Sequence, residues 1–424
     1  MDKNDTNFHN NKEDSNIGKL FLNKYNCIQK IGKGSFGTIY KVEYNGNYYA
    51  AKLEKIDNEL NFLENEVSIM NYLKGPNIPY IIDYDSDSNY NILVMQLLGK
   101  SLDTLLKDKK QFSLKTVCMI GYQIISILEY IHNRHIIHRD IKPDNFVMGL
   151  NELSQYVYLL DFGLAKKYRS SKSLEQIPFV YRNKIIGTAR YSSINALKGY
   201  EQSRRDDLEA VGYILIYFFK GILPWQGLHA KNKEEKYSKI LQKKIEISPE
   251  ELCNGLPEEF EKFIKYVKNL EYLEQPDYEM MRGYFNSMLR QENNKFDYIY
   301  DWTTYEERRK RRVITPRSEL SSIQNKKTTN VTNKHLADTI EDNNDDLNNY
   351  LTLRKNKGFN NNIIKEEINQ SNNSIINLKN NHKNGENKEE EQQINISKIK
   401  KYHLNNTNNN KEETVCCSSG CIII

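Results

Sequence analysis

The stretch HRDIKPDN, His138 to Asn145, concentrates charged and polar side chains that could carry out a reaction. Two acids, a lysine and an asparagine within six residues make poor core material, but they suit phosphoryl transfer. Asp140 can accept the proton of an attacking hydroxyl, and Lys142 can neutralise charge on the transferring phosphate. Asn145 offers an amide oxygen to a magnesium ion, while Pro143 restricts the backbone of the segment.

A further acid follows sixteen residues after Asn145, where Asp161 opens the triplet DFG behind the β-rich stretch YVYLL. Magnesium favours carboxylate and phosphate oxygens as ligands. We therefore expect Asp161 and Asn145 to be metal ligands, with Asp161 holding the ion that bridges the phosphates of a nucleotide.

A glycine-rich segment, IGKGSFGTIY, contains the spacing Gly32-x-Gly34-x-x-Gly37. The same spacing marks dinucleotide-binding folds, but there it must open a helix. Here TIYKVEY is followed by Asn45-Gly46 and NYYAAKLE, and Asn-Gly between β-rich segments is a strong hairpin signal. The pattern predicts antiparallel strands whose loop folds over phosphates, because glycine lets backbone amides approach them. A glycine-rich hairpin without a ligand is the alternative.

Lys52 stands six residues beyond that turn, on what we expect to be the third strand of a small lobe. It could be an ordinary charge at the end of a strand unless it has a partner. LNFLENEVSIMNYLKG predicts a helix, because its apolar residues recur at steps of three and four, and Glu66 falls beside that apolar stripe. A lysine that holds phosphates and is fixed by a helix glutamate is the arrangement of protein kinases. Glu64 is the rival partner, on a face more exposed to solvent.

The elements that position these residues belong to a chain of 424 residues with 38% hydrophobic content and a net charge of +5. This charge is too small to indicate nucleic-acid binding. The opening segment is polar and lacks the features of a signal peptide. The apolar run LEAVGYILIYFF from Leu208 has twelve residues, where a membrane span needs roughly 20, so it predicts a buried helix. Cys27, Cys118 and Cys253 are isolated, and we expect reduced thiols in the core of a cytosolic protein.

Composition divides the chain into three parts. We expect a disordered N-terminal segment over 1–22 and an ordered domain over 23–305, with a small lobe over about 23–97 and a large lobe over about 98–305. After RRKRR the chain becomes an Asn-, Lys- and Glu-rich tract with few large apolar residues, so residues 306–424 are expected to be a disordered tail. No repeat of 20–50 residues is visible.

Taken together, these motifs resemble the casein kinase 1 family of protein serine/threonine kinases, over roughly Tyr25 to Trp302. Three further segments carry the resemblance: GTARYSSIN from Gly187, EQSRRDDLE from Glu201, and LPWQGL from Leu223. The resemblance implies an α+β, bilobed kinase fold, with a small antiparallel β lobe plus one helix and a larger, mainly helical lobe. It also implies ATP with Mg²⁺, transfer of the γ-phosphate to Ser or Thr, and activity without phosphorylation of the activation segment.

The resemblance implies roles for other residues too. Met95 would be the gatekeeper, Leu97 and Leu98 the hinge, and Asp207 the support of the catalytic loop. The expected nucleotide contacts are Ile31, Gly32, Lys33, Gly34, Ser35, Phe36, Gly37, Thr38, Ile39, Ala50, Lys52, Met95, Leu98, Val147 and Leu160.

The family prefers a Ser or Thr downstream of an acidic or phosphorylated residue, and its anion pocket maps to Arg190, Lys236 and the backbone of Gly227. Two cations can hold a dianionic phosphate through charge-assisted hydrogen bonds; ordinary surface charge is the alternative. The chain departs from relatives at Gln96 and Lys100 of the hinge. It also departs at Lys184, which could weaken or shift recognition of a primed substrate.

The C-terminal residues CCSSGCIII give the tail a second expected feature. Cys421 with three isoleucines fits a C-a-a-X prenylation box, although Ile is not a standard last residue. Cys416 and Cys417 would then be palmitoylated, because two lipids give a stable anchor where one gives marginal binding. RRKRR could serve as a membrane-binding cluster, a nuclear signal or the solvated end of the domain.

The sequence thus predicts a monomeric serine/threonine kinase acting on acidic or phosphate-primed proteins, at the cytosolic face of a membrane and with a nuclear fraction possible. It predicts no nucleic-acid partner. One alternative is an inactive kinase-fold scaffold, which would be expected to lack Lys52, Asp140 or Asp161. The other is a soluble kinase whose tail, through SELSS or KKTT, occupies the anion pocket and inhibits it.

Overall fold

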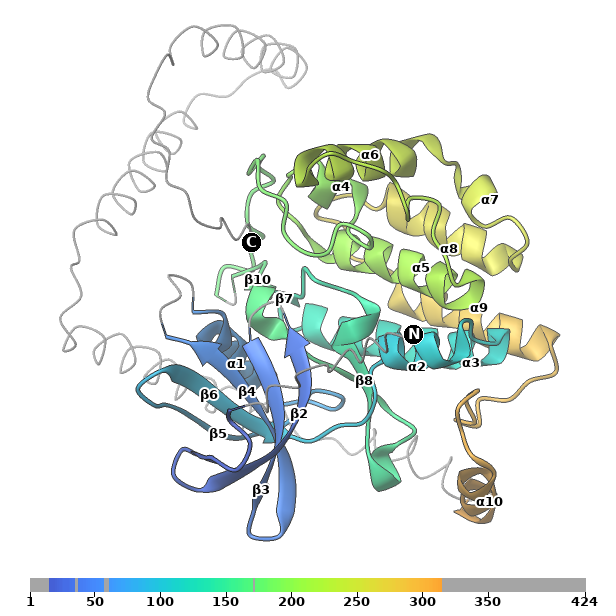
Figure 1. Ribbon diagram of the computed structural model, residues 1–424. Coiled ribbons are helices and arrows are strands. Elements are labelled where there is room, and N and C mark those ends of the chain that lie inside the picture. Colours follow the sequence, from blue (N-terminus) through green and yellow to red (C-terminus); the bar gives the residue numbers. More distant parts are fainter. Residues whose placement is uncertain (1–14, 35–36, 57–60, 171, 315–424) are drawn as a thin grey trace, which may run out of the picture. The chain divides into compact units, whose positions relative to one another are not determined.

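The computed structural model describes residues 15–34, 37–56, 61–170 and 172–314, with side chains described to residue 309. A curled antiparallel sheet forms a small N-terminal lobe, and helices form a larger second lobe (Figure 1). The bilobed α+β fold predicted from the sequence is confirmed.

Six strands build the sheet, in the order β1-β2-β3-β4-β6-β5. Their bounds are Leu20–Phe21 (β1), Tyr25–Gly34 (β2), Gly37–Tyr44 (β3), Asn47–Lys55 (β4), Ile81–Ser86 (β5) and Tyr90–Gln96 (β6). Asn45 and Gly46 turn β3 into β4 with φ values of 51° and 75°, as the Asn-Gly signal predicted. Because side chains alternate along a strand, β4 presents Ala51 and Leu53 to one face and Ala50 and Lys52 to the other.

The two faces of the sheet are buried in different ways. Ala51 and Leu53 lie in a small cluster with Phe21 and Tyr40, whereas Ala50 belongs to the main core together with helix α1 (Phe62–Leu73). Lys52 therefore points toward α1 and the large lobe.

The ordered domain begins earlier than predicted. Phe21 in β1 pairs with Tyr25, and its side chain is buried against Tyr40, with ring centroids 5.6 Å apart. The boundary expected at residue 23 is therefore too late, and Lys52 lies on the fourth strand rather than the third. A two-residue strand is too short to give a periodic signal in the sequence.

The large lobe is built around long helices, of which α3 and α5 are the most buried. Its helices are α2 (Leu102–Lys109), α3 (Leu114–His132), α4 (Ile194–Leu197), α5 (Arg204–Lys220), α6 (Lys233–Glu246), α7 (Pro249–Leu252), α8 (Glu258–Asn269), α9 (Tyr278–Gln291) and α10 (Tyr305–Ile314). Short strands and 3-10 turns carry the catalytic segments: β7 (Ile136–Ile137), η1 (Pro143–Asn145), β8 (Phe146–Met148), η2 (Asn151–Leu153), β9 (Val157–Leu159), η3 (Phe162–Leu164) and β10 (Lys166–Lys167).

Two helices of the described residues, α3 and α5, contain long apolar stretches that could be mistaken for a membrane span. α3 is the one helix there that is long and apolar enough to cross a bilayer, but two thirds of its apolar window is buried and it packs against α5 and α9. α5 contains the apolar run from Leu208, and nearly all of it is buried in the lobe, as predicted. Both are core helices of the large lobe.

The last described helix, α10, runs past residue 306, where the sequence predicted a disordered tail. Thr304 and Glu307 start it with reciprocal bonds: the Thr304 hydroxyl accepts from the Glu307 N–H, and the Glu307 carboxylate accepts from the Thr304 N–H. The boundary expected at residue 306 therefore lies inside helix α10, which also contains RRKRR.

Candidate active site

Lys52 makes contacts that join the two lobes. Its Nζ lies 2.6 Å from Glu66 Oε2 on α1 and 2.8 Å from Asp161 Oδ1 in the DFG segment. Lys52 and Glu66 are 6% and 1% exposed, so these charges interact away from bulk water. The predicted Lys52–Glu66 pair is present, whereas Glu64 forms its described hydrogen bond with Asn61.

Burial and charge act in opposite directions on this cluster. Burial disfavours the ammonium form of Lys52, but Asp161 and Glu66 outweigh it, so the pKa of Lys52 lies above its ordinary value. Burial likewise works against the carboxylate of Asp161, yet Lys52 and Lys142 hold its pKa below the ordinary value. Both groups are therefore charged at neutral pH.

Asp140 lies at the centre of a second cluster. Its Oδ2 accepts a hydrogen bond from Lys142 Nζ at 2.5 Å, and its Oδ1 accepts one from the Thr188 hydroxyl at 2.8 Å. Thr188 belongs to the GTAR segment, whose backbone lies very close to that of the catalytic loop. A Cβ on Gly187 would lie only 2.4 Å from the Arg139 carbonyl oxygen. Gly187, with φ of 97°, is thus the residue that lets Thr188 reach Asp140.

Asp207, at the start of α5, holds the backbone of the catalytic loop. Its carboxylate accepts from the N–H groups of His138 (2.8 Å) and Arg139 (2.9 Å) and from His132 Nε2 (3.0 Å). Burial lowers the pKa of His132, so a neutral ring donates from Nε2 and accepts at Nδ1 from the Tyr278 hydroxyl. The supporting role that the resemblance implied for Asp207 matches these contacts.

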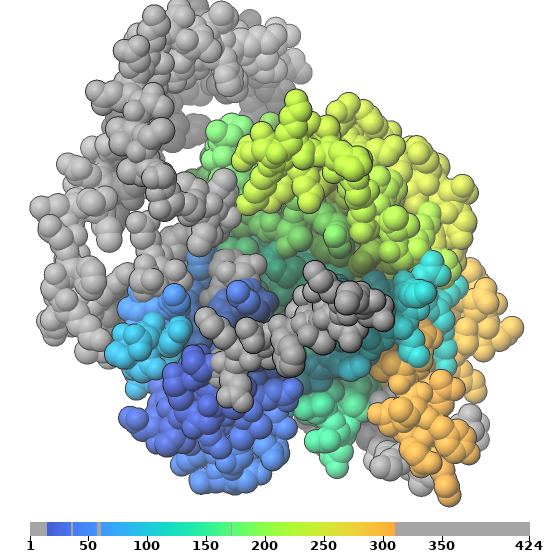
Figure 2. Space-filling view, viewed as in Figure 1, coloured from blue at the N-terminus to red at the C-terminus, as the bar shows by residue number. Residues whose placement is uncertain are grey.

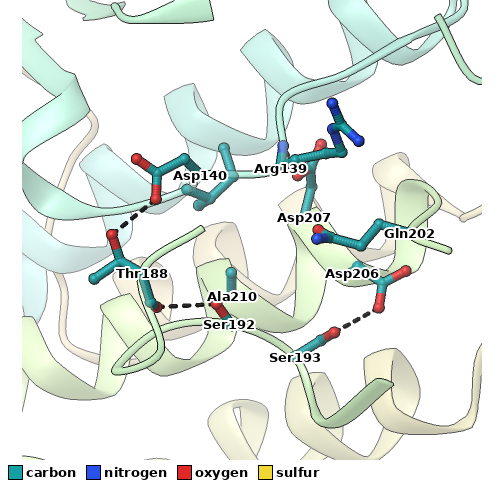
Figure 3. A pocket seen from close by; sticks show the side chains of 10 residues that line it. Arg139, Asp140, Thr188, Ser192, Ser193, Gln202, Asp206, Asp207 and Ala210 are labelled. Atoms are coloured by element: carbon teal, nitrogen blue, oxygen red, sulfur yellow. Dashed lines mark hydrogen bonds between the residues drawn. The ribbon is translucent and has the colours of Figure 1, made fainter. Parts of the chain in front are cut away.

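A small polar cavity lies between the catalytic loop and α5 (Figure 3). Its wall carries the Thr188–Asp140 bond on one side and, on the other, a bond from the Ser193 hydroxyl to Asp206 at 2.5 Å (Figure 3). Ser193 is also the N-cap of α4, whose Ala196 N–H donates to its hydroxyl. Burial raises the pKa of Asp206 to about 7.

Asp161 and Asn145 fit a magnesium ion. The Asn145 amide nitrogen donates to the Asp140 carbonyl at 2.9 Å, which leaves its amide oxygen for a ligand. Asp161 has one carboxylate oxygen toward Lys52, and its backbone takes the left-handed conformation with φ of 66°. Carboxylate and amide oxygens are donors that Mg²⁺ accepts, with the remaining positions left for water and phosphate.

The glycine-rich segment is a β hairpin, as predicted. Gly34 pairs with Gly37 across β2 and β3, and a Cβ on Gly37 would lie 2.2 Å from the Leu53 carbonyl oxygen. No larger residue could take the place of Gly37 without moving β4. Ser35 and Phe36, which were expected to contact the nucleotide, lie outside the described residues.

The apolar residues expected around an adenine occupy both lobes. Ala50 and Met95 are register partners on β4 and β6, and both are buried in the main core. Val147 on β8 is buried, while Leu160 is half-buried. Ile31, by contrast, is 46% exposed at the edge of β2.

The residues expected to bind a substrate anion are exposed and lack ion-pair partners among the described residues. Arg190 precedes α4, and its Nη1 lies 3.5 Å from the Tyr191 hydroxyl. Its backbone is fixed, because Trp225 Nε1 donates to the Arg190 carbonyl at 2.7 Å. Lys236 is on α6, part of the outer face of the large lobe (yellow-green, Figure 2). No described bond joins Arg190, Lys236 and Gly227, although α4 and α6 pack together.

Some functional side chains were not found from the sequence. Thr188 lies inside the quoted motif GTAR, but only the structure shows its bond to Asp140. Lys244 on α6 is fully buried and donates to the Ala189 and Ser192 carbonyls at 3.3 and 2.5 Å. No local pattern distinguished Lys244 from the other lysines of α6. Cys416, Cys417 and Cys421 lie outside the described residues, so their lipidation stays a prediction.

The arrangement can hold a nucleotide and a metal between the lobes and place Asp140 where a hydroxyl group would attack. Comparison with models of known protein families agrees with it. The protein kinase domain model matches residues 25–277, which is more than half of the chain.

Proposed function

Because the chain belongs to the protein kinase family, we propose that it transfers the γ-phosphate of ATP to Ser or Thr side chains of acidic or phosphate-primed proteins, as a kinase of casein kinase 1 type. One observation carries the proposal: Lys52, Glu66 and Asp161 are already in contact, and Asp140 is oriented by Lys142 and Thr188. These are the groups that phosphoryl transfer requires, and no described contact has to break to bring them together.

Each residue has a step in this mechanism. Lys52 holds the α- and β-phosphates, and Glu66 keeps its ammonium group in place. Asp140 orients the substrate hydroxyl and accepts its proton, while Lys142 balances charge on the transferring phosphate. Asp161 and Asn145 would hold Mg²⁺, which neutralises phosphate charge when bound.

The proposed preference for acidic or phosphorylated substrates rests on Arg190 and Lys236. Both are exposed cations, and neither forms an ion pair with a carboxylate in the part of the chain that the structure describes. The bond from Trp225 fixes the backbone at Arg190, and Thr188 of the same segment contacts Asp140. An anion bound by Arg190 would therefore be held at a fixed position relative to the catalytic base, Asp140.

The test compares phosphorylated and unphosphorylated versions of one acidic peptide as substrates. Arg190→Ala should lower the ratio of their kcat/KM values by about 10-fold, because a charge-assisted bond to phosphate is lost. Arg290→Ala, which removes an exposed arginine of α9, is the matched control and should leave the ratio unchanged. An unchanged ratio in Arg190→Ala would remove the anion site from the proposal.

Lys52, Asp140 and Asp161 are all present and in contact with their partners, which favours a working enzyme over an inactive scaffold. Inhibition by the tail and anchoring at a membrane concern residues outside the described part of the chain. Both stay predictions of the sequence.

A further inference from the structure

We propose that Asn65 is a positioning residue that clasps the backbone of the DFG segment to helix α1 and so holds Asp161 in its metal-binding position. This inference rests on the proposed function in one respect, namely the role of Asp161 in phosphoryl transfer. Nothing in the sequence motifs pointed to Asn65, which stands beside the conspicuous Glu66.

The evidence is a set of three contacts from one amide group. Asn65 Nδ2 lies 3.3 Å from the Phe162 carbonyl oxygen, 2.9 Å from that of Gly163 and 3.1 Å from that of Ala165. Because an amide nitrogen carries two N–H bonds, the three carbonyls share two donors. The amide oxygen cannot take this place, since it would face three other oxygens.

These carbonyls belong to the turn that follows Asp161. Asp161 has a left-handed backbone and is the N-cap of η3, while the Ala165 N–H closes the turn onto the Phe162 carbonyl at 2.9 Å. The turn also packs tightly on α1, because a Cβ on Gly163 would lie 3.3 Å from Phe62 Cβ. Fixing the turn fixes the direction in which the Asp161 carboxylate leaves the backbone.

Two consecutive residues of α1 thereby hold one segment in two ways. Glu66 acts on the Asp161 side chain through Lys52, and Asn65 acts on the backbone just after it. Successive residues of a helix point about 100° apart, so the two contacts approach the segment from different directions. A rotation or outward shift of α1 would break both, which couples the position of the helix to that of the metal ligand.

The choice of asparagine supports a tertiary role. Asparagine is a poor residue for the interior of a helix, and Asn65 is half-buried in the first half of α1. Its side chain is therefore better explained by the carbonyls that it binds than by the stability of the helix. The three contacts of Asn65 involve no phosphorylated residue. They would therefore hold the DFG segment without a phosphate on the activation segment.

The test replaces Asn65 in the full-length protein. Asn65→Asp keeps the shape but presents oxygens to three carbonyls, and Asn65→Ala removes the donor while improving helix propensity. Asn71→Asp, an exposed position on the same helix, is the matched control. The first readout is hydrogen–deuterium exchange of the peptide that spans 161–166 in the nucleotide-free protein. The second is kcat and the Mg²⁺ concentration that gives half the maximal rate.

We expect Asn65→Asp and Asn65→Ala to raise the exchange rate of that peptide roughly 10-fold and to lower kcat by a similar factor, because bonds that hold the turn are lost. The Mg²⁺ requirement should rise, while the KM for the peptide substrate stays within about two-fold. Asn71→Asp should match the wild type in each readout.

Two results with Asn65→Ala would overturn the proposed role of Asn65. One is an unchanged hydrogen–deuterium exchange rate of the 161–166 peptide, and the other is an increased exchange rate with unchanged kcat and unchanged Mg²⁺ requirement. If Asn65→Asp does not fold, Asn65→Ala alone decides. The exchange readout needs no turnover, so a wild-type protein that fails to transfer phosphate would overturn the proposed function instead.

Discussion

Asp140 is held from two sides by residues that are far apart in the sequence. Lys142 comes from its own loop, whereas Thr188 comes from the GTAR segment and reaches it only because Gly187 allows the two backbones to approach. The sequence placed Asp140 and Lys142 in one catalytic segment, with Lys142 expected to neutralise charge on the transferring phosphate, and the structure adds the bond between them. The sequence could not predict the second contact, because nothing local to Thr188 shows which loop it will meet.

Thr188→Val removes the hydroxyl that donates to Asp140 while keeping the shape of the side chain. A bond to a charged acceptor is lost, so kcat should fall roughly 10-fold, with little change in the KM for ATP. Thr188→Ser keeps the donor and should retain most of the activity. Steady-state kinetics of both variants check this, and equal kcat values for Thr188→Val and the wild type would contradict it.

At the scale of elements, α6 supports the loop that carries Thr188 and Arg190. Lys244 donates to two carbonyls of that loop and lies over the rings of Tyr213 and Trp225, at 4.3 and 4.7 Å from their centroids. The hydrophobic stripe of α1 and the Asn-Gly turn were readable from periodicity and turn chemistry. The buried position of Lys244 could not be predicted from the sequence, because each of the several lysines of α6 is expected to face solvent.

Lys244 should make stability depend on pH in a defined window. Burial lowers its pKa from 10.5 to about 7, against the opposing effect of Glu209. Between these values the unfolded chain binds a proton that the folded chain lacks, so the free energy of unfolding rises with pH and this contribution is lost as pH falls toward 7. Asp206 has the opposite effect on the free energy of unfolding, and at lower pH. Burial raises its pKa from 3.8 to about 7, so between these values its contribution falls as pH rises.

Urea unfolding at pH 7 and pH 9.5 tests this contribution. Lys244→Met removes the titrating group, so its unfolding free energy should rise less with pH than that of the wild type, by on the order of a few kcal/mol. Lys243→Met, one residue earlier on α6, serves as the control and should follow the wild type. Parallel pH dependences for Lys244→Met and the wild type would be inconsistent with a neutral buried amine.

At the scale of the whole molecule, the two lobes and the order of the catalytic motifs were predictable, because long periodic helices and hairpins carry strong local signals. The first and last elements of the domain were not predicted from the sequence. β1 has only two residues, and α10 begins at a Thr304–Glu307 capping box that the charged run after it obscured. The capping box was a usable signal in the sequence.

The proposed mechanism requires that this site transfer phosphate to hydroxyl side chains with Asp140 as the base. The most direct measurement incubates the purified chain with γ-labelled ATP, Mg²⁺ and an acidic protein, and identifies the labelled amino acid. We predict phosphoserine and phosphothreonine with the wild type, and at least a 100-fold lower rate with Asp140→Asn at unchanged ATP affinity, since general base catalysis contributes about 100-fold or more. Label on tyrosine or no transfer by the wild type would rule out a serine/threonine kinase, and wild-type turnover by Asp140→Asn would rule out Asp140 as the base.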